Sequence, residues 1–346
     1  MLSRFRRINP RSSRCPSLDI QEDGCWESLL TTLIQLCQMP RDPYTIKRYT
    51  APHNCDSVEV NPSKSRAFVG MYEYEESSAS RGGGFLIMSS EGELVHNHST
   101  PNYGCLDAKW ISDSDIAFAC SDGLIRTYST FSNSVSSEVP VVPHPSPTNT
   151  ANILMTIDVV KETTAVITAK GELILVKEGQ VVTRWEAHSP IIESWTCALR
   201  PDANLVATGS DDCSLRFWDT RSQELVLSNT KSHRMGTTCI EFLGESEVLS
   251  GSYDDRIRKF DLRNLSEPIL EFKSIGGIWR LKPTESNHLM VAACYGGCQV
   301  VDLTDFSPVV SRYVEHESMA YGIDSISADT GVSCSFYDKQ ILYWKY

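Results

Sequence analysis

A pattern of short, β-rich runs separated by turn residues recurs along the chain. In its clearest form, a unit begins near His188, turns at residues 200–202 and ends at Trp218. Two later units, beginning at His233 and His316, follow the same plan. Short runs of this kind, bounded by turn residues, predict strands rather than helices. Because one small sheet cannot bury its own apolar face, such units must pack against one another.

Alignment of the third strand in each unit gives seven equivalent positions. They are spaced 40 to 48 residues apart, at Met88, Tyr128, Val176, Trp218, Phe260, Val301 and Trp344. This period, with a His-to-Trp-Asp pattern, resembles the WD repeat of β-propellers. We therefore predict an all-β, seven-bladed WD-repeat β-propeller over residues 44–346. Residues 1–43 are predicted to form a short N-terminal extension, partly disordered, with a short helix between residues 26 and 39.

The three units that begin with a His should carry a polar tetrad of His, Ser or Thr, Asp and Trp, whereas the first three units lack the His and the Trp. A neutral imidazole donates and accepts at once, so it can link a carboxylate to a hydroxyl inside a sheet stack. We expect these residues to hold the blades together rather than to catalyse. The predicted tetrads are His188, Thr208, Asp212 and Trp218; His233, Ser250, Asp254 and Phe260; and His316, Cys334, Asp338 and Trp344.

The last unit stops after its third strand, at Tyr346. An unpaired sheet edge invites aggregation, so we expect the segment from Tyr44 to Tyr49 to supply the missing outer strand. The Gly- and Ser-rich segment from Glu73 to Gly84 is predicted to be a long, mobile loop.

Composition narrows the function classes. Lys and Arg number 32 and Asp and Glu number 44, a formal charge of −12, which disfavours nucleic acid as a partner. No apolar run reaches the ~18 residues needed to cross a bilayer, so no membrane partner is expected. The twelve cysteines form no CxxC pair, which predicts reduced thiols in a cytoplasmic protein and no metal site.

Several stretches are more specific than the general repeat. GGIWRLK (276–282), AYGID (320–324) and CSFYD (334–338), in this order, resemble the diphthine methyl ester hydrolase family, a WD-repeat family of diphthamide biosynthesis also called diphthine methyltransferase. The resemblance implies a carboxylic ester hydrolase that removes the methyl ester from methylated diphthine on translation elongation factor 2. It implies water as nucleophile, methanol and diphthine as products, and no cofactor. It also implies elongation factor 2 as partner and, with it, other diphthamide-pathway enzymes; we expect a monomer.

The implied substrate carries a trimethylammonium group, which aromatic faces and carboxylates bind well. First strands should line the central channel, so residues at their starts are candidates for the site. We expect the substrate to be bound by Trp195, Trp279 and Tyr321. Ester hydrolysis needs a base and donors to an oxyanion, and the candidate catalytic residues are Glu193, Asp324 and His233 as base and Arg280 as oxyanion donor.

A non-catalytic role is the alternative. The sequence from Trp218 to Arg221 matches the WDxR pattern of substrate receptors in cullin-RING ubiquitin ligases, and the sequence from Phe260 to Arg263 is a degenerate copy. The chain would then be an adaptor, or a scaffold for other diphthamide enzymes.

Overall fold

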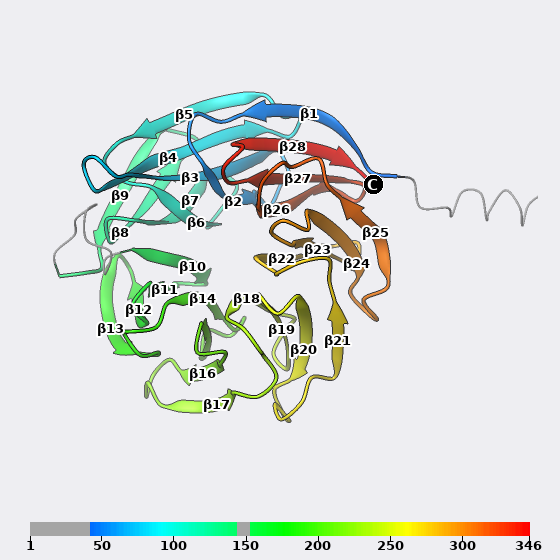
Figure 1. Cartoon of the computed structure of the whole chain (residues 1–346). Helices are drawn as coiled ribbons and strands as arrows, with labels where there is room; N and C mark the ends of the chain where they lie inside the picture. The colour runs from blue at the N-terminus through cyan, green and yellow to red at the C-terminus, as the bar shows by residue number, and fades with distance from the viewer. Residues whose placement is uncertain (1–41, 144–152) are drawn as a thin grey trace, which may run out of the picture. The chain divides into compact units, whose positions relative to one another are not determined.

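Seven four-stranded antiparallel sheets follow one another around a ring in the computed structural model, which describes residues 42–143 and 153–346 (Figure 1). The described residues belong to one unit, Asp42–Tyr346. The predicted all-β, seven-bladed WD-repeat propeller is thus confirmed. The helix predicted between residues 26 and 39 lies outside the described residues. Within the described ranges, no helix is long and apolar enough to cross a membrane.

The first three blades are built in chain order, each from the channel outward. Blade 1 contains β2 (Cys55–Val60), β3 (Arg66–Glu75), β4 (Ser80–Ser89) and β5 (Leu94–Thr100). Blade 2 contains β6 (Cys105–Trp110), β7 (Asp115–Cys120), β8 (Leu124–Ser129) and β9 (Ser134–Pro140). Blade 3 contains β10 (Leu154–Val160), β11 (Thr163–Thr168), β12 (Glu172–Lys177) and β13 (Gln180–Glu186).

The remaining blades follow the same order until the ring closes. Blade 4 contains β14 (Ser194–Leu199), β15 (Leu205–Ser210), β16 (Leu215–Asp219) and β17 (Leu225–Asn229). Blade 5 contains β18 (Thr237–Phe242), β19 (Glu247–Ser252), β20 (Arg256–Asp261) and β21 (Leu270–Lys273). Blade 6 contains β22 (Arg280–Pro283), β23 (His288–Ala292), β24 (Cys298–Asp302) and β25 (Pro308–Tyr313), and blade 7 contains β26 (Ala320–Ser327), β27 (Thr330–Ser335), β28 (Gln340–Lys345) and β1 (Tyr44–Thr50).

The ring is closed by strands from the two ends of the described unit. β1 pairs antiparallel with β28, from Tyr44 opposite Lys345 to Thr50 opposite Gln340. The backbone N–H of Ala51 extends the pairing by donating to Lys339 at 2.8 Å. The expected outer strand is therefore present, and blade 7 has four strands like the other six blades.

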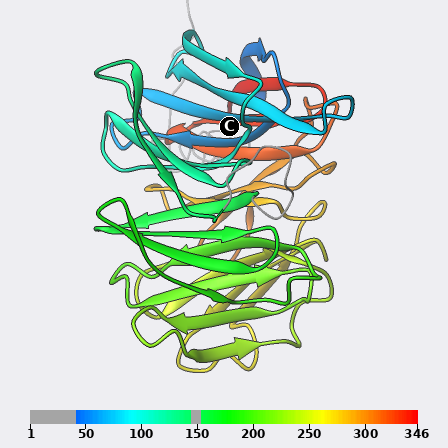
Figure 2. The same ribbon diagram turned by 90° about the vertical axis from the view of Figure 1, so that its left-hand side faces the viewer.

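The blades pack face to face around the ring, as the side view shows (Figure 2). Each inner strand contacts the inner strand of the next blade, and β26 contacts β2. The contacts are close enough to require glycine in places. A Cβ atom on Gly251 would lie 2.4 Å from the side chain of Ile278 and 2.5 Å from the Sγ of Cys239. These apolar interfaces between blades form the hydrophobic core.

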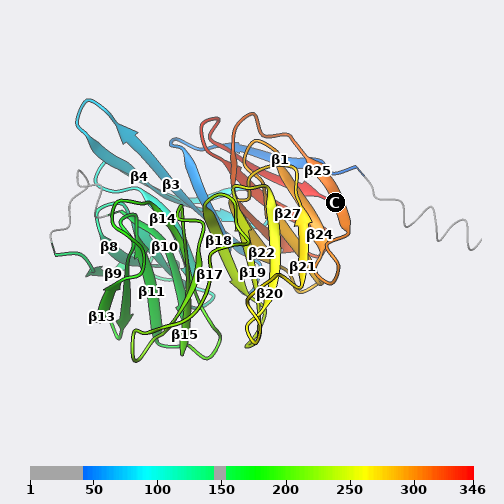
Figure 3. The same cartoon turned by 60° about the horizontal axis from the view of Figure 1, so that its bottom comes forward.

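The expectation of a long loop from Glu73 to Gly84 was wrong. β3 and β4 continue as a paired hairpin through this segment, with Glu73 opposite Gly82 and Glu75 opposite Ser80, and only residues 76–79 form the turn. The hairpin projects beyond its neighbours (Figure 3). Glycines in a sequence often mark the end of a strand, but here Gly83 and Gly84 lie within β4, with φ of +138° and +89°. A Cβ atom at either position would collide with the backbone of a neighbouring strand. Glycine therefore fits these positions of the paired hairpin, and a larger residue does not.

Candidate functional site

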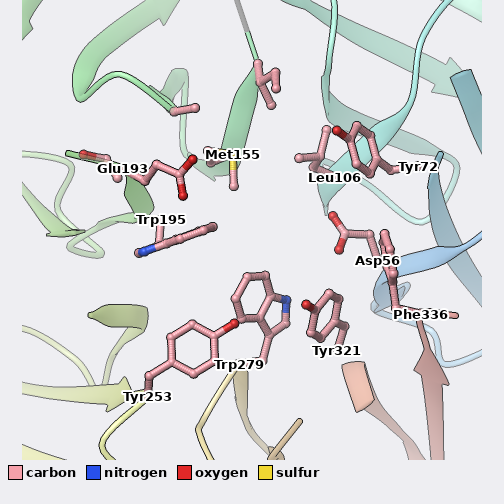
Figure 4. Close-up of a pocket in the computed structure, with 13 residues that line it drawn as sticks. Asp56, Tyr72, Leu106, Met155, Glu193, Trp195, Tyr253, Trp279, Tyr321 and Phe336 are labelled. Atoms are coloured by element: carbon pink, nitrogen blue, oxygen red, sulfur yellow. The ribbon is translucent and has the colours of Figure 1, made fainter. Parts of the chain in front are cut away.

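A pocket of about 260 Å³ opens at one mouth of the central channel, where the inner strands begin (Figure 4). All seven blades contribute residues to its lining: Asp56, Tyr72, Leu106, Ile153, Met155, Ala169, Glu193, Ser194, Trp195, Tyr253, Trp279, Tyr321 and Phe336. Aromatic side chains dominate, and two carboxylates are present. A concave, mainly apolar pocket with a few polar groups is the usual form of a binding site.

A repeated irregularity in the inner strands explains why these side chains meet. Most inner strands shift register near their start, and one residue is left unpaired with the neighbouring strand. Such a β-bulge bends the strand and redirects a side chain. The residues skipped in this way that line the pocket are Asp56, Leu106, Met155, Trp195 and Tyr321. A sixth skipped residue, Thr238 of β18, does not line it.

The aromatic side chains form a connected group. The rings of Trp279 and Tyr321 stack with centroids 4.3 Å apart and planes 17° apart. Trp195 meets Trp279 edge-on at 5.6 Å, Tyr253 lies 5.7 Å from Trp279, and Phe336 lies 5.3 Å from Tyr321. The structure therefore brings together the three residues that the sequence suggested for substrate binding. Mutual packing holds these rings in place, so they lose little side-chain conformational entropy when a ligand binds.

The two carboxylates differ in environment. Glu193 is exposed at the rim, whereas Asp56 is only 7% exposed. Burial raises the pKa of Asp56 to about 7; nearby Arg280 opposes this effect, and nearby Asp107 adds to it. Figure 4 shows Glu193 and Trp195 on one side of the pocket and Asp56 and Tyr72 on the other. A carboxyl group with a pKa near neutrality is typical of functional sites.

Arg280 lies deeper than the pocket. Its guanidinium lies 3.1 Å from the Oδ1 atom of Asp107, and the side chain lines a small adjoining cavity together with Asp56 and Trp279. The ion pair raises the pKa of Arg280 further, against the effect of burial. Arg280 therefore affects the electrostatic environment of the pocket from below, and its head group does not line the pocket wall.

Asp324 does not line the pocket, and this prediction from sequence position needs correction. Its Oδ2 accepts a hydrogen bond from the backbone N–H of Val60 at 2.9 Å, which ties blade 7 to blade 1. Asp107 and Asp158 make the equivalent bonds to the next blade, to Ile157 N at 3.0 Å and Leu199 N at 2.7 Å. A carboxylate engaged in this way connects neighbouring blades.

His233 is likewise separate from the pocket. Its Nε2 lies 2.9 Å from the Ser250 Oγ, and the ring is buried inside blade 5. Burial lowers the pKa of His233 to about 4, with a further contribution from the nearby Arg258. The residue therefore belongs to the blade framework in this structure, and it does not line the pocket.

The tetrads differ from blade to blade. In blade 4, His188 bridges Asp212 at 3.0 Å and Thr208 at 2.9 Å, and Trp218 Nε1 donates to Thr208 at 3.0 Å. In blade 5, Asp254 instead accepts from the backbone N–H of Arg234 at 2.9 Å.

Blade 7 requires a correction of one residue in the alignment. The hydroxyl partner of His316 and Trp344 is Ser333, at 2.7 and 3.1 Å, and not the predicted Cys334. Asp338 accepts from the backbone N–H of Glu317 at 2.8 Å. Adjacent strand residues point to opposite faces, so a shift of one residue exchanges the side chain inside the network.

The sequence reasoning missed several residues of the pocket: Asp56, Tyr72, Met155, Tyr253 and Phe336. One signal was available for two of them. Asp56 and Met155 hold the second position of their inner strands, as Trp195 and Tyr321 do. Blade 1 has neither the His nor the Trp of the repeat, so its first strand was not aligned with the others. Tyr253 and Phe336 follow second strands, where the repeat gives no functional cue.

Arg221 lies at the other end of the blades. It follows β16, in the turn before β17, whereas the pocket residues lie at the starts of inner strands or toward the ends of second strands. Because successive turns of an antiparallel sheet alternate between its two ends, the WDxR arginine is on the opposite face. Arg221 is 78% exposed and pairs with Asp219 at 3.2 Å. Arg263 is 82% exposed and pairs with Asp261.

Comparisons with known proteins agree with this architecture. Residues 179–219 match the family model described as WD domain, G-beta repeat. A solved structure entitled Crystal Structure of Mitotic Checkpoint Complex contains a chain with a TM-score of 0.69, 12% identity, and coverage of 97% of this chain and 99% of that chain. At this identity the likeness concerns the fold alone.

Five of the sequence relatives carry the name diphthine methyltransferase or diphthine methyltransferase homolog. The chain is 34% identical to the diphthine methyltransferase homolog of Dictyostelium discoideum over 46% of this chain and 52% of the relative. It is 35% identical to the diphthine methyltransferase of Mus musculus over 45% of this chain and 36% of the relative. The matched region thus spans about half or less of these relatives. The chain is a WD-repeat β-propeller and a homologue, over about half of its length, of the proteins named diphthine methyltransferase.

Proposed function

We propose that this protein hydrolyses the methyl ester of methylated diphthine on translation elongation factor 2, producing diphthine and methanol in diphthamide biosynthesis. The observation that carries the proposal is the pocket of Figure 4, where Trp195, Trp279 and Tyr321 surround a space that also holds two carboxylates. The names of the relatives support a role in diphthine modification.

The pocket has the chemistry that a trimethylammonium group requires. This cation has no N–H to donate, so it is held by the negative faces of aromatic rings and by unpaired carboxylates. Trp195 and Trp279 supply indole faces, which attract cations most strongly, and Glu193 supplies a negative charge at the rim. Together they would draw the modified side chain in and orient the ester beside it.

Hydrolysis suits the pocket better than transfer of a methyl group. A volume of about 260 Å³ is below the ~300–1,000 Å³ usual for sites that hold drug-sized molecules. The space therefore fits one modified side chain and a water molecule better than a side chain together with a nucleotide-sized methyl donor. Ester cleavage by water also needs a base that can accept a proton, and the pocket contains two carboxylates, Asp56 and Glu193.

Partners and location follow from the same proposal. Elongation factor 2 would be the protein partner, with other diphthamide enzymes acting before and after, and the propeller would act as a monomer. All nine cysteines in the described part of the chain are free thiols, which fits the reducing cytoplasm.

The proposal is tested by incubating the purified chain with elongation factor 2 that carries the esterified residue. We expect stoichiometric release of methanol and loss of one methylene mass from the modified peptide. Trp279→Ala is the matched variant, because it removes the central ring of the cluster. Unchanged peptide mass after incubation with the folded wild-type protein would show that the chain is not this hydrolase.

A further inference from the structure

We propose that Asp56 is the general base of this hydrolysis and that the hydroxyl group of Tyr72 donates to the oxyanion that forms on the ester carbonyl. The assignment rests on the proposed function and deepens it. Both residues come from blade 1, on the neighbouring strands β2 and β3, and both were absent from the candidates that the sequence suggested.

The position of Asp56 is the first argument. It occupies the bulge of β2, between the pairs Cys55–Met71 and Ser57–Gly70, and its carboxylate is directed into the pocket (Figure 4). The residue is 93% buried, since only 7% of it is exposed. In contrast to Asp107, Asp158 and Asp324, it has no hydrogen bond to a neighbouring blade among the described residues.

A buried carboxylate without hydrogen-bond donors is costly, and native proteins seldom retain one without a use. The neighbouring inner-strand carboxylates show that this ring readily supplies backbone donors to such groups. Asp56 faces the pocket instead, so its lone pairs remain available to a water molecule or a substrate.

The charges around Asp56 leave it able to exchange a proton near neutral pH. Burial raises its pKa to about 7, Arg280 counteracts the shift from β22, and Asp107 adds to it from β6. The other titratable groups that interact with it are Tyr72, Tyr321, Cys105 and Cys334. A base with a pKa near the working pH combines a useful ionised fraction with a strong drive to accept a proton.

Tyr72 is arranged as a hydrogen-bond donor. The Nε–H of Arg81 donates to the phenol oxygen at 3.1 Å, which occupies an acceptor position and leaves the hydroxyl proton free to point elsewhere. Burial raises the pKa of Tyr72, so the hydroxyl stays protonated. The ring is also confined, because a Cβ atom on Gly104 would lie 2.7 Å from it.

Asp56 and Tyr72 can together assist both steps of the ester hydrolysis. Asp56 takes a proton from water as the water oxygen forms a bond to the ester carbon. The carbonyl electron pair moves to oxygen, where Tyr72 donates a hydrogen bond. The tetrahedral species then collapses, the bond to the methoxy group breaks, and the leaving methoxide takes the proton from Asp56. Methanol departs, and the new carboxylic acid releases its proton to solvent.

Glu193 is assigned the other task. It is exposed at the rim, on the side of the pocket opposite Asp56 (Figure 4), where a negative charge attracts a cation without needing to change protonation state. The two carboxylates thus divide the work between charge attraction and proton transfer.

The test compares Asp56→Asn with Glu317→Gln in the full chain. Glu317 is exposed, lies in the loop before β26 on the same face, and does not line the pocket. Asn keeps the shape of Asp but cannot accept the proton, so we expect turnover at saturating substrate to fall at least about 100-fold. Direct binding of the esterified factor by Asp56→Asn should stay within about threefold of wild type.

The pH profile supplies a second readout. Wild-type kcat/KM should fall tenfold per pH unit below an inflection near pH 7, where Asp56 becomes protonated. Tyr72→Phe should lower turnover about 100-fold, as loss of one oxyanion donor does elsewhere, while it leaves that inflection in place.

Each outcome has a distinct meaning. If wild-type protein releases no methanol, the proposed function itself fails. If wild type is active and Asp56→Asn keeps more than a tenth of its turnover, Asp56 is not the base. If Asp56→Asn weakens binding but turns over normally at saturation, Asp56 is a counter-ion to the substrate, which also overturns the assignment. Circular dichroism and thermal melting of both variants establish that they are folded.

Discussion

The indole of Trp279 lies parallel to the phenol ring of Tyr321, with the centroids 4.3 Å apart. These rings come from the adjacent blades 6 and 7, so the stack depends on the packing of one blade against the next. The same contact supports both rings from behind and leaves their neighbours Trp195 and Tyr253 around one space. The pocket is therefore a property of the whole propeller, and no single blade could form it.

Replacement of Trp279 should weaken capture of the substrate cation. A cation–π contact contributes about 0.5–2 kcal/mol, so Trp279→Ala should raise the Kd for the esterified factor by roughly 2- to 30-fold, and Trp279→Phe by less. Calorimetry or fluorescence titration would measure the change. The control is Phe131→Ala, which removes an aromatic ring that is 93% exposed and outside the pocket. Equal affinity of Trp279→Ala and wild type would argue against aromatic capture.

Removal of the charge beside the proposed base should move the pH profile. Asp107 raises the pKa of Asp56 and also occupies Arg280. In Asp107→Asn both effects favour the ionised form of Asp56, so the inflection in kcat/KM should move from near pH 7 to lower pH, by about 0.5–1 unit. Steady-state rates between pH 5 and 9 would show the shift. An inflection that stays in place, or moves upward, would contradict the assignment.

The hydrogen-bond network of blade 4 should contribute more stability than that of blade 5. Thr208 serves both His188 and Trp218, whereas Ser250 bonds to His233 beside a phenylalanine that has no N–H. Thr208→Val should cost about 2–3 kcal/mol, because it leaves two buried groups without a partner, and Ser250→Ala about 1 kcal/mol. Urea unfolding of the two variants would rank them. If Ser250→Ala lowers the free energy of unfolding more than Thr208→Val does, the number of hydrogen bonds in a tetrad does not determine its contribution to stability.

A variant on the opposite face separates the hydrolase from the adaptor. Arg221→Ala removes an exposed side chain whose partner is Asp219 in the same turn, far along the blade from the inner-strand starts. We expect methanol release within twofold of wild type and a melting temperature within about 1 °C. An adaptor would instead co-purify with a ubiquitin-ligase core and lose it in this variant. That result, together with no ester hydrolysis by wild type, would favour the adaptor.

Much of the fold could be predicted because each repeat shows its strands and turns within a short stretch of sequence. Strand runs, turns and the spacing of His188, Trp218 and their equivalents indicated seven blades and a strand before the first one. The predicted aromatic residues also met in one place, since equivalent positions on inner strands converge at one end of the channel. One error arose where a shift of a single residue along a strand changes which side chain joins the tetrad, as with Ser333 and Cys334.

The amino-acid sequence alone determined the strand period, the number of blades and three of the aromatic residues at the channel mouth, Trp195, Trp279 and Tyr321. Only the tertiary structure decided which carboxylates serve the framework and which face the pocket. Asp324 and Asp56 both occur in inner strands, but one finds a backbone N–H on the next blade and the other is turned by a bulge into the pocket. That difference depends on the placement of a neighbouring blade far away in sequence, which strand periodicity does not encode.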